Sequence, residues 1–144
     1  MNPGLKEQDV TRQILGCFFK VYNSLGYGFL EKVYEKALAI ELRNKGLTVV
    51  CQQGVKVYYE GDLIGEYCAD IVVNGTVIIE LKVADAIHPA HESQLINYLK
   101  ATEIEIGLLL NFGPKPTFVR KFFSNENKKI GAKDADDTDQ ADLR

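Results

Sequence analysis

The chain has 144 residues, 46% of them hydrophobic, and a formal net charge of -3 at pH 7. This composition is typical of one globular domain and excludes collagenous and wholly disordered chains. The apolar runs are far shorter than the roughly 20 residues that a membrane-spanning helix needs, so we expect no membrane partner. The N-terminus lacks the apolar stretch of a secretory signal, and the sequence therefore predicts a cytoplasmic protein.

The negative charge is concentrated at the C-terminal end. Residues 131–144 hold five aspartates and two basic residues, and the rest of the chain is neutral. Because this segment has no periodic apolar residues, we predict a disordered acidic tail over 131–144 and one folded domain over residues 5–125. A few basic residues precede the tail: Lys115, Arg120, Lys121, Lys128 and Lys129. A neutral domain gives only weak electrostatic support for nucleic-acid binding.

The cysteines and histidines offer no strong metal signal. Cys17, Cys51 and Cys68 are odd in number and lie far apart among apolar residues, which predicts reduced cysteines packed in the core. A structural zinc site requires paired ligands at short spacing, and these cysteines have none. His88 and His91 have a spacing that can ligate a metal, but near a helix N-terminus we interpret them as capping or solvent-facing.

Helical periodicity marks three segments. Apolar residues recur at helical spacing over residues 7–25, and the glycines at 26 and 28 end that run. A second helix is predicted over 30–44, with Glu35 on its polar side. A third helix is predicted from Pro89 to Thr102, since proline is favoured in the first turn.

Short segments rich in valine, isoleucine and tyrosine predict six strands, over residues 47–53, 55–60, 63–73, 76–84, 106–112 and 117–123. Turn residues at 60–62 and 74–75 predict that the second to fourth strands form an antiparallel meander. The strands before and after the third helix can pair in parallel through a crossover. The predicted fold class is therefore α/β, with a mixed β-sheet flanked by helices.

Three charged residues interrupt apolar strands. Asp70 lies within 67–73, and Glu80 and Lys82 lie within 77–83. An ionised group in such a run is costly to bury unless it is paired or binds a metal. Glu80 and Lys82 face the same way because side chains alternate along a strand. The simpler alternative is a Glu80–Lys82 pair on a solvated face of the sheet.

The turn between these two strands decides whether the acids can meet. A two-residue hairpin at Asn74-Gly75 places Asp70 and Glu80 on opposite faces. A three-residue loop of Val73, Asn74 and Gly75 places Asp70 on the same face as Glu80. We predict the three-residue loop, or a bulge elsewhere with the same effect.

Polar residues on two predicted helices complete the candidate site. Glu31 projects from the apolar side of the second helix, together with Tyr34 and Leu38. Gln94 and Tyr98 are four residues apart and share one face of the third helix. Taken alone, Glu31 can be a border residue that reaches solvent, and Gln94 and Tyr98 can form an ordinary solvated face.

The order of these residues resembles a known active-site signature. Asp70, the Glu80-Leu81-Lys82 element, and then Gln94 and Tyr98 on the following helix resemble the PD-(D/E)XK nuclease superfamily. Residues 28–34, with Gly28, Glu31 and Tyr34, also resemble the motif of the GxxExxY protein family, a branch of that superfamily. The resemblance extends from about residue 14 to residue 123. It departs from the superfamily's name at Ala69, where the name has proline.

The resemblance implies a restriction-endonuclease-like core and a divalent ion, Mg²⁺ or Mn²⁺ as a substitute. Asp70, Glu80 and the main-chain carbonyl of Leu81 would hold the ion, and Glu31 would complete or support that shell. Mg²⁺ prefers such oxygen ligands, lowers the pKa of bound water and stabilises charge that develops on a phosphate.

In the same comparison Lys82 would orient the attacking water or neutralise the phosphorane, and Gln94 and Tyr98 would contact phosphate or bound water. The implied catalytic residues are Glu31, Asp70, Glu80, Lys82, Gln94 and Tyr98. The implied reaction is metal-dependent hydrolysis of phosphodiester bonds in nucleic acid, with DNA as the expected substrate.

Two alternatives stay open at this point. The same fold can serve as a non-catalytic module that binds nucleic acid or a partner protein, and the neutral charge of the domain favours that interpretation. A metal-dependent hydrolase of a substrate other than nucleic acid is the second alternative. Exposed sheet edges are also compatible with a homodimer.

Overall fold

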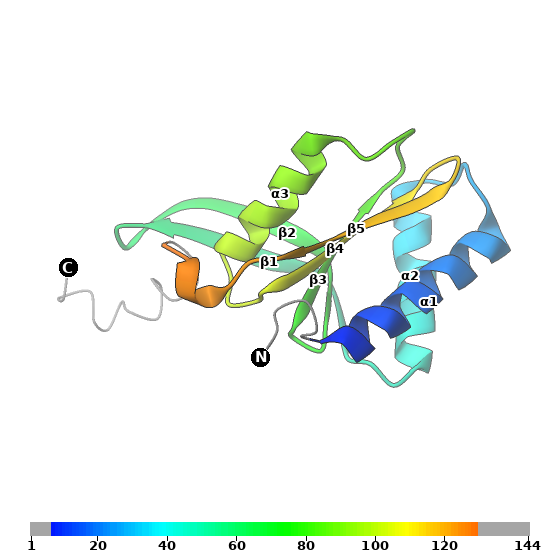
Figure 1. Cartoon of the computed structure of the whole chain (residues 1–144), viewed down its shortest axis with the longest axis horizontal. Coiled ribbons are helices and arrows are strands. Elements are labelled where there is room, and N and C mark those ends of the chain that lie inside the picture. Colours follow the sequence, from blue (N-terminus) through cyan, green and yellow to red (C-terminus); the bar gives the residue numbers. More distant parts are fainter. Residues whose placement is uncertain (1–6, 130–144) are drawn as a thin grey trace.

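The computed structural model describes residues 7–129 (Figure 1). Its helices are α1 (Gln8–Leu25), α2 (Glu31–Asn44) and α3 (Pro89–Lys100), with a short 3-10 helix, η2 (Asn125–Asn127). Its strands are β1 (Val49–Tyr59), β2 (Asp62–Val73), β3 (Val77–Lys82), β4 (Ile106–Phe112) and β5 (Pro116–Phe122). The predicted tail, 131–144, and the start of the predicted domain lie outside the described residues. No described helix combines the length and apolar character needed to cross a membrane.

The five strands form one mixed sheet in the order β1-β2-β3-β4-β5. Neighbouring strands are antiparallel except β3 and β4, which are parallel and are connected through α3. A parallel pair requires such a crossover, because its strands run in the same direction. The predicted α/β class, the meander and the parallel pair are confirmed, and the architecture is that of a restriction-endonuclease-like fold.

The helices cover the sheet from both sides (Figure 1). Helices α1 and α2 pack on one face, where Phe18, Tyr34 and Phe112 form a buried aromatic group. The rings of Tyr34 and Phe112 stack with centroids 4.2 Å apart, and Phe18 meets Phe112 edge-on at 4.9 Å. Helix α3 packs on the other face through Leu95 and Leu99. The two buried clusters fix the helices relative to the ends of β2 and β3.

The prediction of separate strands at 47–53 and 55–60 is wrong. These residues form one continuous strand, β1, whose pairing with β2 includes Gly54 opposite Cys68. The sequence pattern breaks at Gly54, but the irregular backbone lies two residues earlier, at Gln52, which has a left-handed φ of 55°. A residue in this conformation rotates a strand without ending it, much as a β-bulge does.

The loop between β2 and β3 has three residues, but not the three that we predicted. It consists of Asn74, Gly75 and Thr76, because Val73 pairs with Val77. Asn74 and Gly75 both have positive φ, 54° and 68°, which asparagine and glycine tolerate best. The one-residue shift moves the loop without changing the parity of the register, so the two acids share a face as predicted and in addition lie directly opposite each other.

The cysteines differ from one another in burial. All three are free: Cys17 is buried, Cys51 is half-buried and Cys68 is exposed. The core prediction is therefore confirmed for Cys17 and wrong for Cys68, which is exposed on β2 opposite Gly54 of β1. The histidines are helix-capping, since the amide of His88 donates to Nδ1 of His91 at 3.2 Å.

Candidate active site

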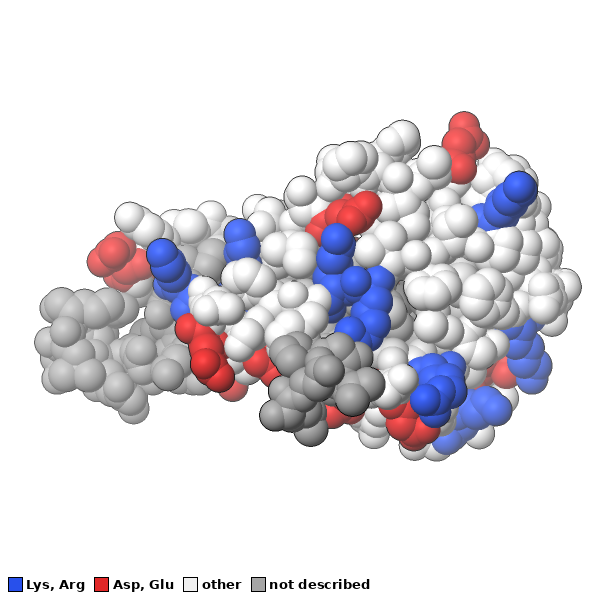
Figure 2. Space-filling view, viewed as in Figure 1, with Lys and Arg blue, Asp and Glu red and all other residues white. Residues whose placement is uncertain are grey.

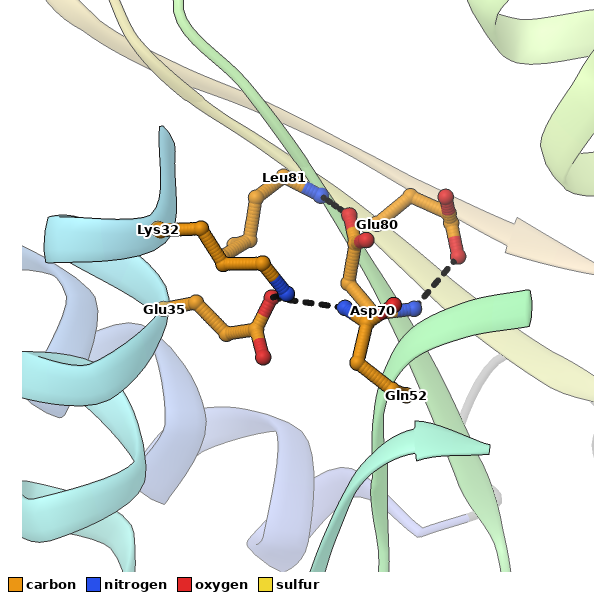
Figure 3. Close-up of polar contacts among 6 residues, drawn as sticks. All are labelled: Lys32, Glu35, Gln52, Asp70, Glu80 and Leu81. Carbon is orange, nitrogen blue, oxygen red and sulfur yellow. Dashed lines mark hydrogen bonds and ion pairs between the residues drawn. The ribbon is translucent and has the colours of Figure 1, made fainter. Parts of the chain in front are cut away.

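The candidate site lies where β2 and β3 separate. Their backbone pairing is regular from the loop to Ile71 opposite Ile79 and then stops. At the next position, Asp70 opposite Glu80, the side-chain carboxylates accept the hydrogen bonds that backbone carbonyls accept in a regular ladder. The amide of Asp70 donates to Oε2 of Glu80 at 3.0 Å, and the amide of Leu81 donates to Oδ2 of Asp70 at 2.7 Å (Figure 3). The two acids thus lie face to face at the opening of a fork between the strands.

A rotation of β1 and β2 opens this fork. Ile71 packs in the cluster under α1 and α2, but Ala69, two residues earlier, packs in the cluster under α3. Residues two apart in a regular strand share a face, so β2 rotates at Asp70. The left-handed residue Gln52 lies opposite Asp70, between the pairs that Cys51 and Gln53 make with β2. The rotation carries the outer half of the hairpin away from β3 and toward α3.

Glu80 is a buried acid without a cationic partner. It is 5% exposed, and it forms no ion pair with any lysine or arginine of residues 7–129. Burial, and next the charge of Asp70, raise the pKa of Glu80 to about 8, although the Asp70 amide and Lys82 oppose the rise. At neutral pH the metal-free protein therefore holds Glu80 mainly as the neutral acid, because the ionised form would be buried beside Asp70.

Glu31 and Lys82 belong to the same electrostatic group. Glu31 is the first residue of α2, and its pKa is raised by partial burial first and by Asp70 next. The charge of Lys82 lowers the pKa of both Glu31 and Glu80. Since Lys82 lies within reach of both acids but pairs closely with neither, the simple Glu80–Lys82 ion pair on a solvated face is wrong.

Helix α3 places Gln94 and Tyr98 on the other side of the fork. Nε2 of Gln94 donates to the hydroxyl of Tyr98 at 3.3 Å, and Tyr98 is only 6% exposed. Burial and then the charge of Glu80 raise the pKa of Tyr98, which keeps the phenol protonated at neutral pH. Because the Tyr98 oxygen accepts from Gln94, its own proton is left for another acceptor.

The six predicted site residues are therefore brought together from four elements: α2, β2, β3 and α3. One sequence interpretation on α2 is wrong, because Glu35 is buried and not on the polar side of the helix. Its Oε1 accepts from Nε2 of Gln52 at 2.8 Å and lies 3.6 Å from the ammonium of Lys32 (Figure 3). The spacing from Glu31 to Glu35, one helical turn, is the signal that could have identified it.

The segment before α2 has its own anchor. The hydroxyl of Tyr34 donates to the carbonyl of Gly26 and accepts from the amide of Phe29. Gly28, between them, has a φ of 118°, which only glycine adopts readily. The buried tyrosine thus fixes the chain that leads into Glu31.

The donor set is suited to a hard divalent cation, although it is not a three-residue cluster. No group of three or more histidine, cysteine, aspartate or glutamate side chains within residues 7–129 is arranged to hold a metal ion. Asp70 and Glu80 nevertheless converge, and Mg²⁺ is usually bound by one or two carboxylates together with water. The raised pKa of the buried Glu80 carboxyl is the observation that fits a cation, because a bound ion would replace the proton and offset the cost of the buried carboxylate.

The face of the protein that Figure 2 shows is not strongly basic. Figure 2 shows lysines and arginines in small groups interspersed with aspartates and glutamates, and wide areas without charge. Lys121 of β5 pairs with Glu92 of α3 at 2.7 Å. Long-range attraction of phosphate is therefore weak, and any nucleic-acid contact depends on local groups.

Comparisons with known proteins give one family. None of the curated proteins matches the chain. The solved crystal structure of SSO0001 is similar with a TM-score of 0.46 and 14% identity over 78% of this chain, and the chain spans 57% of that protein. The sequence model of the PD-(D/E)XK nuclease superfamily matches residues 8–121, from the start of α1 almost to the end of β5. The chain belongs to the PD-(D/E)XK nuclease superfamily.

Proposed function

We propose that this protein is a metal-dependent nuclease that hydrolyses phosphodiester bonds of nucleic acid, with DNA as the substrate. The observation that carries the proposal is the pair of facing carboxylates, Asp70 and Glu80, fixed across the fork by each other's strand. A buried acid whose pKa is raised to about 8 beside a second acid is typical of catalytic and metal-binding sites, which supports an enzyme over a module that only binds a partner. Membership of the nuclease superfamily supports the same conclusion.

The metal ligands in this proposal are Asp70, Glu80 and the main-chain carbonyl of Leu81, with Glu31 in support. The ion is Mg²⁺, for which Mn²⁺ can substitute. When bound, it supplies Lewis acidity toward the phosphate and a more acidic water. The carboxylates are held by the amides of Asp70 and Leu81 before the ion arrives, so little rearrangement is needed to bind it.

The remaining groups act on the substrate. The ammonium of Lys82 stabilises negative charge that develops on the phosphate oxygens, or orients the attacking water. The Tyr98 hydroxyl donates its proton to a phosphate oxygen, since Gln94 already donates to the Tyr98 oxygen. Gln94 keeps the phenol in this direction and uses its own carbonyl for a water molecule.

We also propose that the chain belongs to the GxxExxY branch of the superfamily. Its support is the role that the three motif residues have in one short segment. Gly28 provides the left-handed turn, Tyr34 ties that turn to the core, and Glu31 begins α2 beside Asp70. The spacing of the motif thus has a physical reason in this chain.

Two further expectations belong to the proposal. A cytoplasmic location is supported by the three free cysteines, because disulfides persist in oxidising compartments. A homodimer or a protein partner is compatible with the sheet, whose edge strands are β1 and β5.

The test is cleavage of labelled single- and double-stranded DNA and RNA, with Mg²⁺, with Mn²⁺ and with chelator. Wild type is compared with Glu80→Gln, which keeps the shape of the side chain and an oxygen for the Asp70 amide. Glu66→Gln, an exposed acid on β2, is the matched control. We expect metal-dependent cutting of DNA that Glu80→Gln loses and Glu66→Gln retains.

The two alternatives have distinct outcomes in the same experiment. Binding of nucleic acid in chelator without cleavage under any metal condition would favour the non-catalytic module. Neither binding nor cleavage would favour a hydrolase of another substrate. Equal cutting by wild type and Glu80→Gln would assign the activity to a contaminant and overturn the proposal.

A further inference from the structure

A pocket of about 700 Å³ opens between the β1–β2 hairpin and α3, directly beside the candidate active site. It is lined by Val57, Tyr67, Ala90, Ser93, Gln94, Asn97 and Tyr98. Two of these residues, Gln94 and Tyr98, also border the carboxylate fork. The volume is in the range of small-molecule sites, and the proposed reaction does not use the remainder of the pocket.

The lining favours an uncharged occupant over a phosphate. None of its seven residues carries a formal charge at neutral pH. A phosphate that leaves water for a pocket needs a cation such as arginine, lysine or a metal ion to compensate its charge, and this lining supplies none. Two phenol rings, two carboxamides and one hydroxyl instead suit an uncharged, flat group with hydrogen-bonding edges.

Tyr67 offers a ring that is already in place. It is 52% exposed, and its side chain lies over Gly65, where an added Cβ would approach Cε2 of the ring to 3.4 Å. The Tyr67 ring also contacts the ring of Tyr98, with the two centroids 5.8 Å apart and the ring planes tilted by 51°. An exposed aromatic ring that is ordered by its own strand loses little entropy when another ring stacks on it.

Two carboxamides on α3, those of Gln94 and Asn97, can form hydrogen bonds with a ligand in the pocket. The carboxamide of Asn97 forms no hydrogen bond with the rest of residues 7–129, and the Gln94 carboxamide uses only its Nε2. Both side chains are exposed on the pocket side of α3. A carboxamide offers both donors and an acceptor, which match the edges of nucleobases.

We propose that this pocket binds an unpaired nucleobase of the nucleic acid whose phosphodiester lies at Asp70 and Glu80. The inference rests on the proposed nuclease function and names its substrate class, single-stranded or locally unpaired nucleic acid. Bases inside a duplex are stacked and paired, so their faces cannot reach Tyr67. Stacking also compensates for the weak electrostatic attraction of a neutral domain, since it does not depend on charge.

The test measures binding in chelator, which separates binding from cleavage. The probe is a short oligodeoxynucleotide with one 2-aminopurine, whose fluorescence reports stacking and suffers no interference because the chain has no tryptophan. It is compared with the same strand in a full duplex and with a strand that has an abasic sugar at the probed position. The variants are Tyr67→Ala, Tyr67→Phe and Asn97→Ala, with Tyr59→Ala, another exposed tyrosine of the hairpin, as the matched control.

We expect fluorescence quenching on binding, and weaker binding of the duplex and of the abasic strand. Tyr67→Ala should weaken binding about 5- to 150-fold, as for other base-stacking aromatics. Asn97→Ala should weaken it about 2- to 10-fold, through the loss of hydrogen bonds. Tyr67→Phe and Tyr59→Ala should bind as wild type does. All three positions, Tyr59, Tyr67 and Asn97, are exposed, so folding is expected to be unaffected.

Three results would overturn the inference: unchanged binding by Tyr67→Ala, duplex bound as tightly as single strand, or no binding of the oligonucleotide by wild type. Failure of the proposed function looks different. Tyr67-dependent binding that is never followed by cleavage with Mg²⁺ or Mn²⁺ would refute the nuclease and keep the base pocket. Metal-dependent cleavage that is equal for single strand and duplex, and unaffected by Tyr67→Ala, would refute the pocket and keep the nuclease.

Discussion

Asp70 and Glu80 hold each other's strands at the point where the sheet opens. The amide of Asp70 donates to the Glu80 carboxylate at 3.0 Å, and the Asp70 carboxylate accepts from the amide that follows Glu80, at 2.7 Å. Carboxylates here satisfy backbone amides that a regular ladder would pair with carbonyls. The exchange fixes the two acids side by side at one place, with consequences that can be measured.

The stability of the metal-free protein should fall as pH rises. The folded-state pKa of Glu80, about 8, lies above its ordinary value, so the folded state binds a proton more tightly than the unfolded state. The contribution of that proton is fully present below the ordinary carboxyl pKa and is lost as pH rises through about 8. In chelator, thermal unfolding of wild type from pH 5 to pH 9 should show a decrease of Tm that Glu80→Gln lacks in large part. Parallel pH profiles for the two proteins would contradict the assignment.

Divalent cations should stabilise the folded protein through the same pair. An ion that binds only the folded state adds about 1.4 kcal/mol at ten times its dissociation constant. Mg²⁺ and Mn²⁺ should therefore raise the Tm of wild type but not of Asp70→Asn. The matched control is Asp62→Asn, an exposed acid at the start of β2, which should respond as wild type does. A similar response by Asp70→Asn would place the ion elsewhere.

Replacement of Lys82 should affect the rate of cleavage and not the fold. Lys82 is half-buried and makes no close ion pair with the described residues, so Lys82→Ala should unfold at a Tm close to that of wild type. Loss of a group that stabilises charge in the transition state should lower the rate about 10²- to 10³-fold. Cleavage under saturating Mg²⁺ measures this effect, with the exposed Lys56→Ala on β1 as the control. A full rate in Lys82→Ala would remove the role assigned to it.

The role of the Tyr34 hydroxyl in holding the segment before Glu31 can be tested by removing that single oxygen atom. Tyr34→Phe removes the hydroxyl that bonds Gly26 and Phe29 but keeps the ring stacked on Phe112. We expect a loss of about 1–2 kcal/mol in the free energy of unfolding, measured with urea. The exposed Tyr59→Phe should show no such loss. Cleavage by Tyr34→Phe should also decrease, because the segment held by the hydroxyl leads directly into Glu31 and positions it.

The loop that follows β3 should be sensitive to a single methyl group. The Asn111 carboxamide binds both the amide and the carbonyl of Ala84, at 2.9 and 3.0 Å, and Gly113 lies so close that an added Cβ would be 2.2 Å from that carbonyl. Gly113→Ala should destabilise the protein by about 2 kcal/mol. Gly16→Ala, on α1 with open space around it, should instead stabilise it by about 0.5–1 kcal/mol. Urea unfolding of both variants checks the opposite signs.

Much of the fold was predictable because its signals are local. Helical periodicity indicated all three helices, and the glycine and asparagine turns indicated the meander. The prediction failed where a single residue departs from its usual conformation or where burial comes from a distant element. Gln52 adopts a left-handed φ inside a strand, which no composition pattern reports. The carboxylate of Glu35 can be buried because it accepts a hydrogen bond from Gln52 and pairs with Lys32. Gln52 lies on β1, far from Glu35 in the sequence, so a local pattern on α2 could not reveal this partner.

The sequence by itself determined that Asp70, Glu80 and Lys82 are out of place, because a charge within an apolar strand is costly wherever the strand lies. It also determined their order along the chain, from which the superfamily resemblance follows. Only the tertiary structure decided that the acids face one another. That outcome depends on the three-residue loop, on the rotation at Gln52 and on α3 packing over the opened fork. Register and strand rotation are set by contacts between segments far apart in the chain, and a local pattern contains no information about them.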